Sequence, residues 1–290
     1  ALMAADILIY HAIHVPVEGP IGLAARRYCK RRGLPFSSSY TTKWPEYLQL
    51  RFHIPPGILY RMLRWFHNGA ARTTVAAPSH KEELEAWGFR NLVFWGRGVD
   101  TDLFRQQSKD VIQAPRPVCM YMGRVAIEKN IQAFLRLELP GTKVVIGPGP
   151  DLAMLERTYP DVRFLGRKQG EDLARHLAAA DVFVFPSRTD TFGIVMIEAM
   201  ACGVPVAAFP VVGPRDVVVH GKTGWLDEDL ARAVDKALAL DPADCRAHAL
   251  QYAWEHSLNQ LENALVPIKR QPTGATVGPD LQADGAPSSS

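Results

Sequence analysis

The side chains with the clearest chemical potential are charged residues that follow apolar segments in the second half of this chain. Arg124 comes soon after the apolar run 118–122, and Lys129 follows five residues later, just before a helical pattern that begins at Asn130. Two cations at the carboxyl end of a strand, beside the N-terminus of a helix, suit a diphosphate. The alternative interpretation is a surface turn with solvated charges.

A second group of residues surrounds the start of another expected helix. Asp190 follows a strand-like apolar run at 182–185, and Thr191, Phe192 and Gly193 open the helix. The free N–H groups at this helix start favour an anion, and Gly193 lets a ligand approach the backbone closely. Glu198 lies on an otherwise apolar helix face, where a carboxylate is costly unless something binds it. A sugar diol is a natural partner, whereas a buried Arg is the structural alternative.

Two loops are expected at the same edge of the sheet. Gly147 opens a Gly-Pro-Gly-Pro segment after the strand 143–146, and Leu165 ends the strand 162–165. Each loop is a weak signal by itself, since Gly-Pro turns are common. Together, their backbone groups would form the wall of a nucleobase site.

Three motifs resemble known binding sites but are incomplete. A dinucleotide fingerprint after residue 146 needs a third glycine where Leu152 stands, and a P-loop ending at Thr223 needs its first glycine where Asp216 stands. His11 and His14 are three residues apart, but a third metal ligand is not near them in the sequence. We therefore expect neither a nicotinamide cofactor nor a metal site.

Composition excludes other classes of protein. The 290 residues include 33 Lys and Arg and 30 Asp and Glu, a net charge of +3, so extensive nucleic-acid binding is not expected. The longest apolar run, 191–214, is interrupted by a charge and by prolines and is no transmembrane span. Four widely spaced cysteines and the lack of a signal peptide favour a reducing compartment, so we expect a cytoplasmic protein.

Short apolar runs alternate with helical patterns, which predicts an α/β fold with parallel sheets. A polar, proline-containing linker at 105–117 separates two Rossmann-like halves. The first strand is expected at 7–10, a capping box at Ser79 and Glu82, and a terminal helix at 243–266. The expected domains are residues 1–110, residues 111–268 with the terminal helix, and a disordered tail of residues 269–290.

Five cations fall on one short helix of the first half, at Arg26, Arg27, Lys30, Arg31 and Arg32. One interpretation is a solvated helix face. The other is a surface that meets anionic lipid or a phosphorylated acceptor, at the inner face of a membrane.

The segment from Met122 to Leu230 resembles the donor domain of retaining glycosyltransferases of family 4, which have the GT-B fold. The resemblance rests on residues 123–130 (GRVAIEKN), 187–206 (SRTDTFGIVMIEAMACGVPV) and 221–225 (GKTGW). The family's Glu-x7-Glu motif falls on Asp190 and Glu198, with Asp in place of the first Glu. The first half is similar to the same subgroup, the GDP-mannose-type α-mannosyltransferases and their sulfoquinovosyl and glucosyl relatives.

The resemblance implies roles for the donor side. Arg124 and Lys129 would hold the diphosphate and stabilise the charge on the leaving group. Asp190, with the amides of Phe192 and Gly193, would bind the sugar hydroxyls and the phosphate, and Glu198 would bind the ribose diol. On the facing half, His14 and Glu18 would approach the sugar and the acceptor.

The implied reaction moves a hexose, mannose first, from a nucleotide diphosphate sugar to a lipid or glycan acceptor with retention of configuration. GDP-mannose is the first expectation for the donor and a UDP-sugar the alternative, and neither a metal nor another cofactor is implied. Two departures from the family bear on turnover: the upstream βα units that the family has before Ile7 are absent, as in an N-terminally truncated chain, and Thr41 stands where the family often has His. A non-catalytic nucleotide-sugar binding fragment and a sugar-nucleotide epimerase remain as alternatives.

Overall fold

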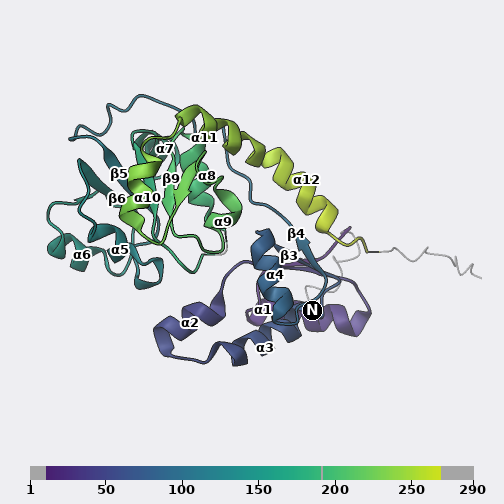
Figure 1. The fold of residues 1–290 in the computed structure, drawn as a ribbon. Helices are drawn as coiled ribbons and strands as arrows, with labels where there is room; N and C mark the ends of the chain where they lie inside the picture. The colour runs from purple at the N-terminus through teal and green to yellow at the C-terminus, as the bar shows by residue number, and fades with distance from the viewer. Residues whose placement is uncertain (1–10, 191, 269–290) are drawn as a thin grey trace, which may run out of the picture.

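The computed structural model of the chain describes residues 11–190 and 192–268. It contains two parallel sheets, one of four strands and one of six, each accompanied by helices (Figure 1). This architecture confirms the α/β expectation with two Rossmann-like halves. The strand expected at 7–10 and the tail at 269–290 lie outside the described residues.

The first sheet has the strand order β1-β2-β3-β4, with every described pair parallel. Its strands are β1 (His14–Val15), β2 (Ser37–Tyr40), β3 (Arg72–Val75) and β4 (Leu92–Phe94). The helices of this half are α1 (Pro20–Arg32), α2 (Trp44–Phe52), α3 (Pro56–His67) and α4 (Pro78–Ala86). All four helices start with proline in the first turn, where the missing N–H costs nothing.

The residues before β1 are paired with the far end of the described chain. Ala12 forms an antiparallel bridge with Pro267, and the N–H of Ile268 donates to the carbonyl of His11 over 2.8 Å. The segment after the last helix therefore supplies main-chain partners to the residues that lead into β1.

The second sheet has the strand order β10-β9-β8-β5-β6-β7. Its strands are β5 (Val118–Met122), β6 (Thr142–Ile146), β7 (Arg163–Phe164), β8 (Val182–Phe185), β9 (Val206–Ala208) and β10 (Gly224–Leu226). The chain builds outward from β5 to β7 and then returns to add β8 on the other side of β5. This reversal leaves a crevice at the carboxyl ends of β5 and β8, which is where ligands bind in open α/β sheets.

Helices cover both faces of the second sheet. They are α5 (Ile131–Leu135), α6 (Leu152–Thr158), α7 (Gly170–Ala178), α8 (Ile194–Ala201), α9 (Pro214–Val217) and α10 (Leu230–Ala237), with a short 3-10 helix η2 (Ile127–Lys129) before α5. Alternate residues of β5 enter two different cores: Met120 packs in the core with α8, and Tyr121 packs in the core with α10. The period-2 alternation of a strand thus fixes β5 between two layers.

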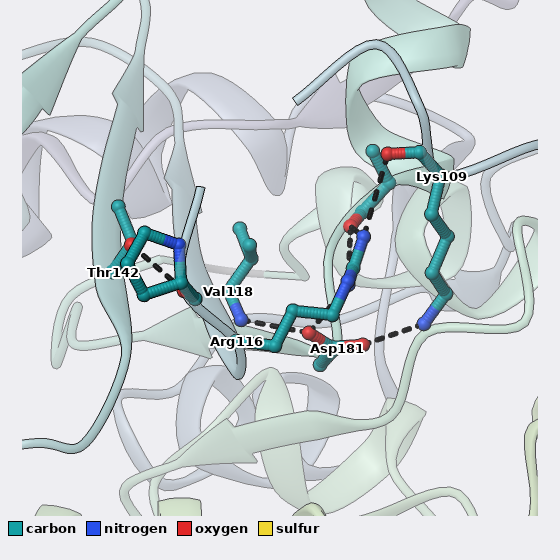
Figure 2. A network of polar contacts seen from close by, with 7 residues as sticks. Lys109, Arg116, Val118, Thr142 and Asp181 are labelled. Carbon is teal, nitrogen blue, oxygen red and sulfur yellow. Dashed lines mark hydrogen bonds and ion pairs between the residues drawn. The ribbon is translucent and has the colours of Figure 1, made fainter. Parts of the chain in front are cut away.

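A polar network fixes the linker at the start of the second sheet (Figure 2). The carboxylate of Asp181 accepts hydrogen bonds from Lys109 over 2.7 Å, Arg116 over 2.6 Å and the N–H of Val118 over 2.7 Å. Burial opposes ionisation of Asp181, but these three donors hold the pKa of its carboxyl below the usual value. Because Asp181 precedes β8 and Val118 begins β5, one carboxylate aligns the two strands whose carboxyl ends flank the crevice.

The terminal helix expected at 243–266 is broken into α11 (Pro242–Ala249), the 3-10 helix η3 (Leu250–Tyr252) and α12 (Trp254–Ala264). The break occurs at Ala253, whose backbone is extended. As a result α12 crosses from the second half to the first, where it contacts β3 and β4 (Figure 1). The indole of Trp95 donates to the carbonyl of Ser257 over 3.1 Å. The expected domain boundary groups this helix with the second half, and the helix packs on both η3 and the first sheet.

The capping box expected at Ser79 is wrong. Ala77 is the N-cap of α4, and this helix has no cap from a side chain of its own start. The carboxylate of Asp216, on α9 of the other half, accepts the N–H of Ser79 over 3.0 Å and also its hydroxyl. The N-terminus of α4 is therefore capped across the two halves of the chain.

Candidate functional site

A hollow of about 420 Å³ lies at the crevice between β5 and β8 and is closed on one side by the first half of the chain. We call it the central hollow. Its walls come from both halves and are Thr41, Arg97, Tyr121, Met122, Gly123, Arg124, Lys129, Phe185, Ser187, Asp190, Phe192, Gly193, Ile194 and Val195. The structure thus brings together Arg124, Lys129, Asp190, Phe192 and Gly193, five of the residues that the sequence predicts at the site.

The two cations that the second half contributes to this wall, Arg124 and Lys129, each form an ion pair. Lys129 pairs with Asp190, and Nη1 of Arg124 lies 3.6 Å from Oε1 of Glu128. Oδ2 of Asp190 and Oε2 of Glu128 are buried and lack a hydrogen-bond partner among the described residues. Both cations are thus held at the hollow by carboxylates whose hydrogen-bonding capacity is only partly used, an arrangement that a polar ligand would complete.

The turn after β5 is shaped by close backbone packing. A Cβ atom at Gly147 would lie 2.0 Å from the carbonyl oxygen of Gly123, so glycine is required where the loops after β5 and β6 meet. The hydroxyl of Tyr121 donates to the carbonyl of Arg124 over 2.8 Å. Burial raises the pKa of this phenol, with further contributions from Asp190 and Glu128, so Tyr121 keeps its proton and holds the turn.

The loop after β8 leads into α8 through a left-handed glycine. Gly193, the N-cap of α8, has φ +79°, and a Cβ there would lie 2.7 Å from Cε of Met196 and 2.9 Å from the ring of Phe185. No side chain among the described residues caps α8, while Ile194 and Val195 of its first turn line the central hollow. The positive end of this helix is thus available to an anion. Thr191, also predicted at the site, lies outside the described residues.

Glu198 lies one helical turn beyond Ile194 and does not line the central hollow. It is partly buried, and the residues on either side of it in α8, Ile197 and Ala199, are fully buried. Its carboxylate has no ion pair or hydrogen bond with the described residues, so the buried Arg considered as a structural partner is not found. Burial raises the pKa of Glu198 to about 7.

Gly147 and Leu165 are not among the residues that line the central hollow. The N–H of Gly147 donates to the carbonyl of Gly166 over 2.8 Å, which joins the two loops. The side chain of Leu165 packs against the core that contains α8. Their predicted contact with a nucleobase therefore stays a prediction.

The two residues expected on the acceptor side are in different environments. His14 lies beside Trp95, with 6.5 Å between ring centroids, and burial together with Arg97, which lines the central hollow, lowers the pKa of its imidazole. Its Nε2 is 3.0 Å from the hydroxyl of Ser39. Nδ1 of His14 is buried without a partner among the described residues, so this nitrogen has an unused capacity for one hydrogen bond.

Glu18 does not line the central hollow. Its Oε1 lies 2.9 Å from Nε2 of His67, and Nδ1 of that ring lies 2.9 Å from the hydroxyl of Ser38. Ser38, His67 and Glu18 are thus connected in the order of a hydrolytic triad. However, His67 and Ser38 are fully buried, so no substrate can reach them. The structure therefore does not bring Glu18 to the site.

Three polar residues on the wall of the central hollow, Ser187, Arg97 and Tyr121, are not among the site residues that the sequence predicts. Ser187 follows β8 directly after Pro186, so the rule that sites form at carboxyl ends of strands was sufficient to find it. Arg97 follows β4 in the same way, in the loop that faces the second half. Tyr121 is a strand residue in an apolar run and gives no such signal.

A cationic face joins α1 and α3 on the first half. We call it the α1–α3 face; around a hollow of about 410 Å³ it carries Arg26, Lys30, Arg61, Arg64 and Trp65. The guanidinium of Arg26 lies 3.8 Å from the centroid of the Trp65 ring and donates to the carbonyls of Trp65 and Phe66. Arg26 is thus a buried structural residue, while the other cations of the face remain accessible.

Other kinds of site are not supported within residues 11–190 and 192–268. This part of the chain holds no cluster of three or more side chains suited to a metal ion. Its helices also include none with the length and apolar character needed to cross a membrane.

Comparison with known proteins gives matches to both halves of the chain. A family model described as Glycosyltransferase Family 4 matches residues 3–103, and one described as Glycosyl transferases group 1 matches residues 116–240. In solved structures, Anabaena Alr3699/HepE in complex with UDP has a TM-score of 0.72 at 20% identity, covering 88% of this chain and 78% of that one. The structural likeness concerns the fold.

Two curated relatives are similar over most of this chain. A GDP-mannose-dependent alpha-mannosyltransferase of Mycolicibacterium smegmatis is 37% identical over 223 residues, 74% of this chain and 60% of the relative. Sulfoquinovosyl transferase SQD2 of Arabidopsis thaliana is 31% identical over 235 residues, 74% of this chain and 46% of the relative. The chain thus spans about half the length of these relatives. Since both family models describe glycosyltransferases and between them match both sheets, the chain belongs to glycosyltransferase family 4 and has the GT-B fold.

Proposed function

We propose that this protein binds a nucleotide diphosphate sugar in the central hollow and transfers the hexose to an acceptor with retention of configuration. The observation that carries the proposal is the meeting of Arg124, Lys129, Asp190 and the uncapped start of α8 around one hollow. A diphosphate needs cations and N–H donors, and a sugar needs carboxylate acceptors. This hollow has all three kinds of group on its walls.

The diphosphate would take Arg124 and Lys129 from their present partners. Both cations are bound to carboxylates at the edge of the hollow, so they are already oriented toward it. As the bond between sugar and phosphate breaks, negative charge grows on the departing phosphate, and fixed cations stabilise that charge without reorganisation. We assign both residues to leaving-group stabilisation.

Asp190 would accept hydroxyls of the donor sugar. Its Oδ2 is buried and unpartnered among the described residues, and Lys129 is the ion-pair partner of its other oxygen. Once the diphosphate recruits Lys129, both carboxylate oxygens are free to accept hydrogen bonds. The same rearrangement that binds the diphosphate thus prepares the sugar site.

Glu198 would hold the ribose of the nucleotide. It follows Ile194 by one turn of α8, so a nucleotide whose phosphates lie at the helix start can extend toward it. For the donor we propose GDP-mannose, because the curated relatives include GDP-mannose-dependent enzymes. The Anabaena structure in complex with UDP makes a UDP-sugar the competing donor.

The test is a thermal-shift panel of GDP, UDP and ADP and their hexose conjugates. A ligand of the folded state raises its free energy of unfolding by about 2.7 kcal/mol at a hundredfold excess over Kd. We expect at least one of these ligands to stabilise the protein, and Lys129→Ala to weaken its binding by about 2 kcal/mol, as the loss of a charge-assisted contact does. The matched control is Lys236→Ala, an exposed lysine of α10. Failure of every nucleotide to stabilise the wild-type chain would reject the proposal.

A nucleotide-sugar binding protein without transferase activity is the second candidate. Thr41 lines the central hollow at the place where the family often has His, which removes one proton-carrying side chain. Transfer measured with the purified chain, a GDP-hexose and a glycoside acceptor distinguishes the two. Labelled glycoside product eliminates the binding-only function.

We also propose that the α1–α3 face contacts anionic lipid, which would keep the protein at the inner face of a membrane beside a lipid acceptor. Between residues 19 and 81, eleven Lys and Arg residues accompany a single acidic residue, Glu46. This segment, which includes the α1–α3 face, therefore has a large excess of positive charge in a chain whose net charge is only +3. Such a concentration of charge favours an anionic surface.

A further inference from the structure

A second hollow of about 310 Å³ adjoins the central hollow, and we call it the side hollow. Its walls are Thr41, Thr42, Lys43, Trp44, Tyr47, Arg124, Glu128, Lys129, Thr189 and Asp190. Four of these residues, Thr41, Arg124, Lys129 and Asp190, also line the central hollow. Molecules held in the two hollows would therefore meet at one shared wall.

An aromatic pair forms one wall of the side hollow. Trp44 and Tyr47 of α2 pack edge to face, with 5.8 Å between ring centroids. The indole of Trp44 is 41% exposed although it is a large apolar surface. The hydroxyl of Tyr47 accepts a hydrogen bond from Arg51 over 3.2 Å, which fixes that ring. An exposed aromatic ring on a hollow is suited to cover the apolar face of a ring-shaped ligand.

The carboxylate of Glu128 also lines the side hollow. Glu128 is only 9% exposed, and its Oε2 has no hydrogen-bond partner among the described residues. The hydroxyl of Thr189 donates to the carbonyl of Glu128 over 3.1 Å and fixes its backbone. A buried carboxylate oxygen needs a donor, and a ligand hydroxyl is such a donor.

The charge balance of the side hollow selects against a phosphorylated ligand. Lys43 on its walls is paired with Glu83 over 2.6 Å, while Arg124 and Lys129, now paired with Glu128 and Asp190, would be taken by the donor diphosphate. No cation on these walls is then left for a second phosphate. The unpartnered oxygen of Glu128 would repel a second anion. The space, at the small end for ligand pockets, fits one polyol ring rather than a long chain.

From these observations we infer that the side hollow is the acceptor subsite and that it takes an uncharged polyol ring, a hexoside or cyclitol, stacked on Trp44 with a hydroxyl donated to Glu128. This inference rests on the proposed function. In the transfer, an acceptor hydroxyl oxygen bonds to the anomeric carbon, the bond from that carbon to the phosphate oxygen breaks, and the hydroxyl proton leaves with the phosphate. The shared wall of the two hollows is where those atoms meet.

The experiment measures binding of two probes, methyl α-mannoside and mannose 6-phosphate, by calorimetry to the full chain saturated with the nucleotide diphosphate that stabilises it. We expect methyl α-mannoside to bind and mannose 6-phosphate to bind more weakly. Trp44→Ala and Glu128→Gln should each weaken the binding of methyl α-mannoside about tenfold. Trp44→Phe should weaken it much less, because stacking is kept. Trp254→Ala, which removes a half-exposed indole of α12, is the matched control and should leave binding unchanged.

The readouts separate this inference from the proposed function. Nucleotide binding is measured first for every variant, together with its thermal midpoint, so an unfolded variant is recognised. If the wild-type chain binds no nucleotide, the proposed function fails. If it binds nucleotide but takes mannose 6-phosphate as well as the glycoside, takes neither, or is indifferent to Trp44→Ala, the acceptor assignment alone is overturned.

Discussion

Among single residues, Glu198 is one whose ionisation is subject to two opposite effects, burial in the free protein and hydrogen bonding in the proposed nucleotide complex. Its position on α8 buries it among apolar neighbours, and this burial raises its pKa to about 7 from the model-peptide range near 4.5. A ribose diol that donates two hydrogen bonds would favour the ionised form instead. Ligand binding and proton release at Glu198 are therefore linked.

This linkage predicts a pH dependence of nucleotide affinity. In the free protein Glu198 is mostly protonated at pH 6 and mostly ionised at pH 8, while the bound state prefers the ionised form. The affinity should therefore rise about tenfold from pH 6 to pH 8 and level off above that. Calorimetry of the stabilising nucleotide across this range measures the effect.

The matched variant is Glu198→Gln, which keeps the size of the side chain and removes its titration. Its affinity should be lower at pH 8 and should change less between pH 6 and pH 8, since only the phosphate still titrates. Equal pH profiles for the wild type and this variant would show that Glu198 does not hold the ribose.

At the scale of elements, the strands that carry the site were predictable. The runs expected at 118–122 and 182–185 are β5 and β8 with the same bounds, because parallel strands buried on both faces are continuous apolar segments. The sites at their carboxyl ends followed from this placement. The fold of the second half is thus readable from local pattern.

Features that depend on distant partners were not predictable in the same way. Ser79 has the spacing of a capping box, but Asp216 takes its hydroxyl and N–H across the two halves. Glu18 is recruited by His67, which is 49 residues away in the chain. The side hollow forms only where the loop after β2 faces η2, so the sequence alone does not reveal that Trp44 and Glu128 are neighbours. Local propensity carries no information on such pairs.

The α1–α3 face combines cations with exposed apolar side chains. On α3, an exposed stripe lies opposite the buried side of the helix and consists of three apolar residues and one cation: Ile58, Met62, Trp65 and Arg61. The helix therefore has apolar side chains on both faces. Exposed apolar side chains between cations suit the interface of an anionic bilayer. We expect the protein to sediment with phosphatidylglycerol vesicles and not with phosphatidylcholine vesicles.

Charge reversal on this face supplies the control. Arg61→Glu should weaken vesicle binding at least roughly tenfold, since each cation near an anionic surface contributes about 1 kcal/mol. Arg136→Glu, at an exposed arginine after α5, should leave it unchanged. Equal binding to both kinds of vesicle, or no loss in Arg61→Glu, contradicts the assignment of a lipid to this face.

At the scale of the whole molecule, two connections set how the halves face each other. One is α12, which leaves the second half and packs on β3 and β4. The other is the cap of α4 by Asp216. Asp216 follows Gly213 by three residues, and the backbone of Gly213 packs beside the carbonyls of Asp190 and Phe192. The second connection therefore joins the first half directly to the loop that holds the candidate donor site.

Removal of this cap should loosen the first half. Asp216→Ala should lower the free energy of unfolding by about 1 kcal/mol, the usual value of a helix N-cap, as measured by urea denaturation. Ser79→Ala retains the N–H donor and should cost less. Asp235→Ala, at an exposed aspartate of α10, is the control. A cost no greater for Asp216→Ala than for Asp235→Ala would mean that the contact does not stabilise the fold.

A crystal structure of the chain with its stabilising nucleotide diphosphate shows whether one hollow between the two halves holds the diphosphate of a nucleotide sugar. We expect phosphate oxygens within hydrogen-bond distance of Arg124 and Lys129, at the start of α8, with the ribose hydroxyls on Glu198. A nucleotide bound outside the central hollow, with Arg124 and Lys129 still in their present ion pairs and no ligand hydroxyl on Glu198, would contradict this assignment.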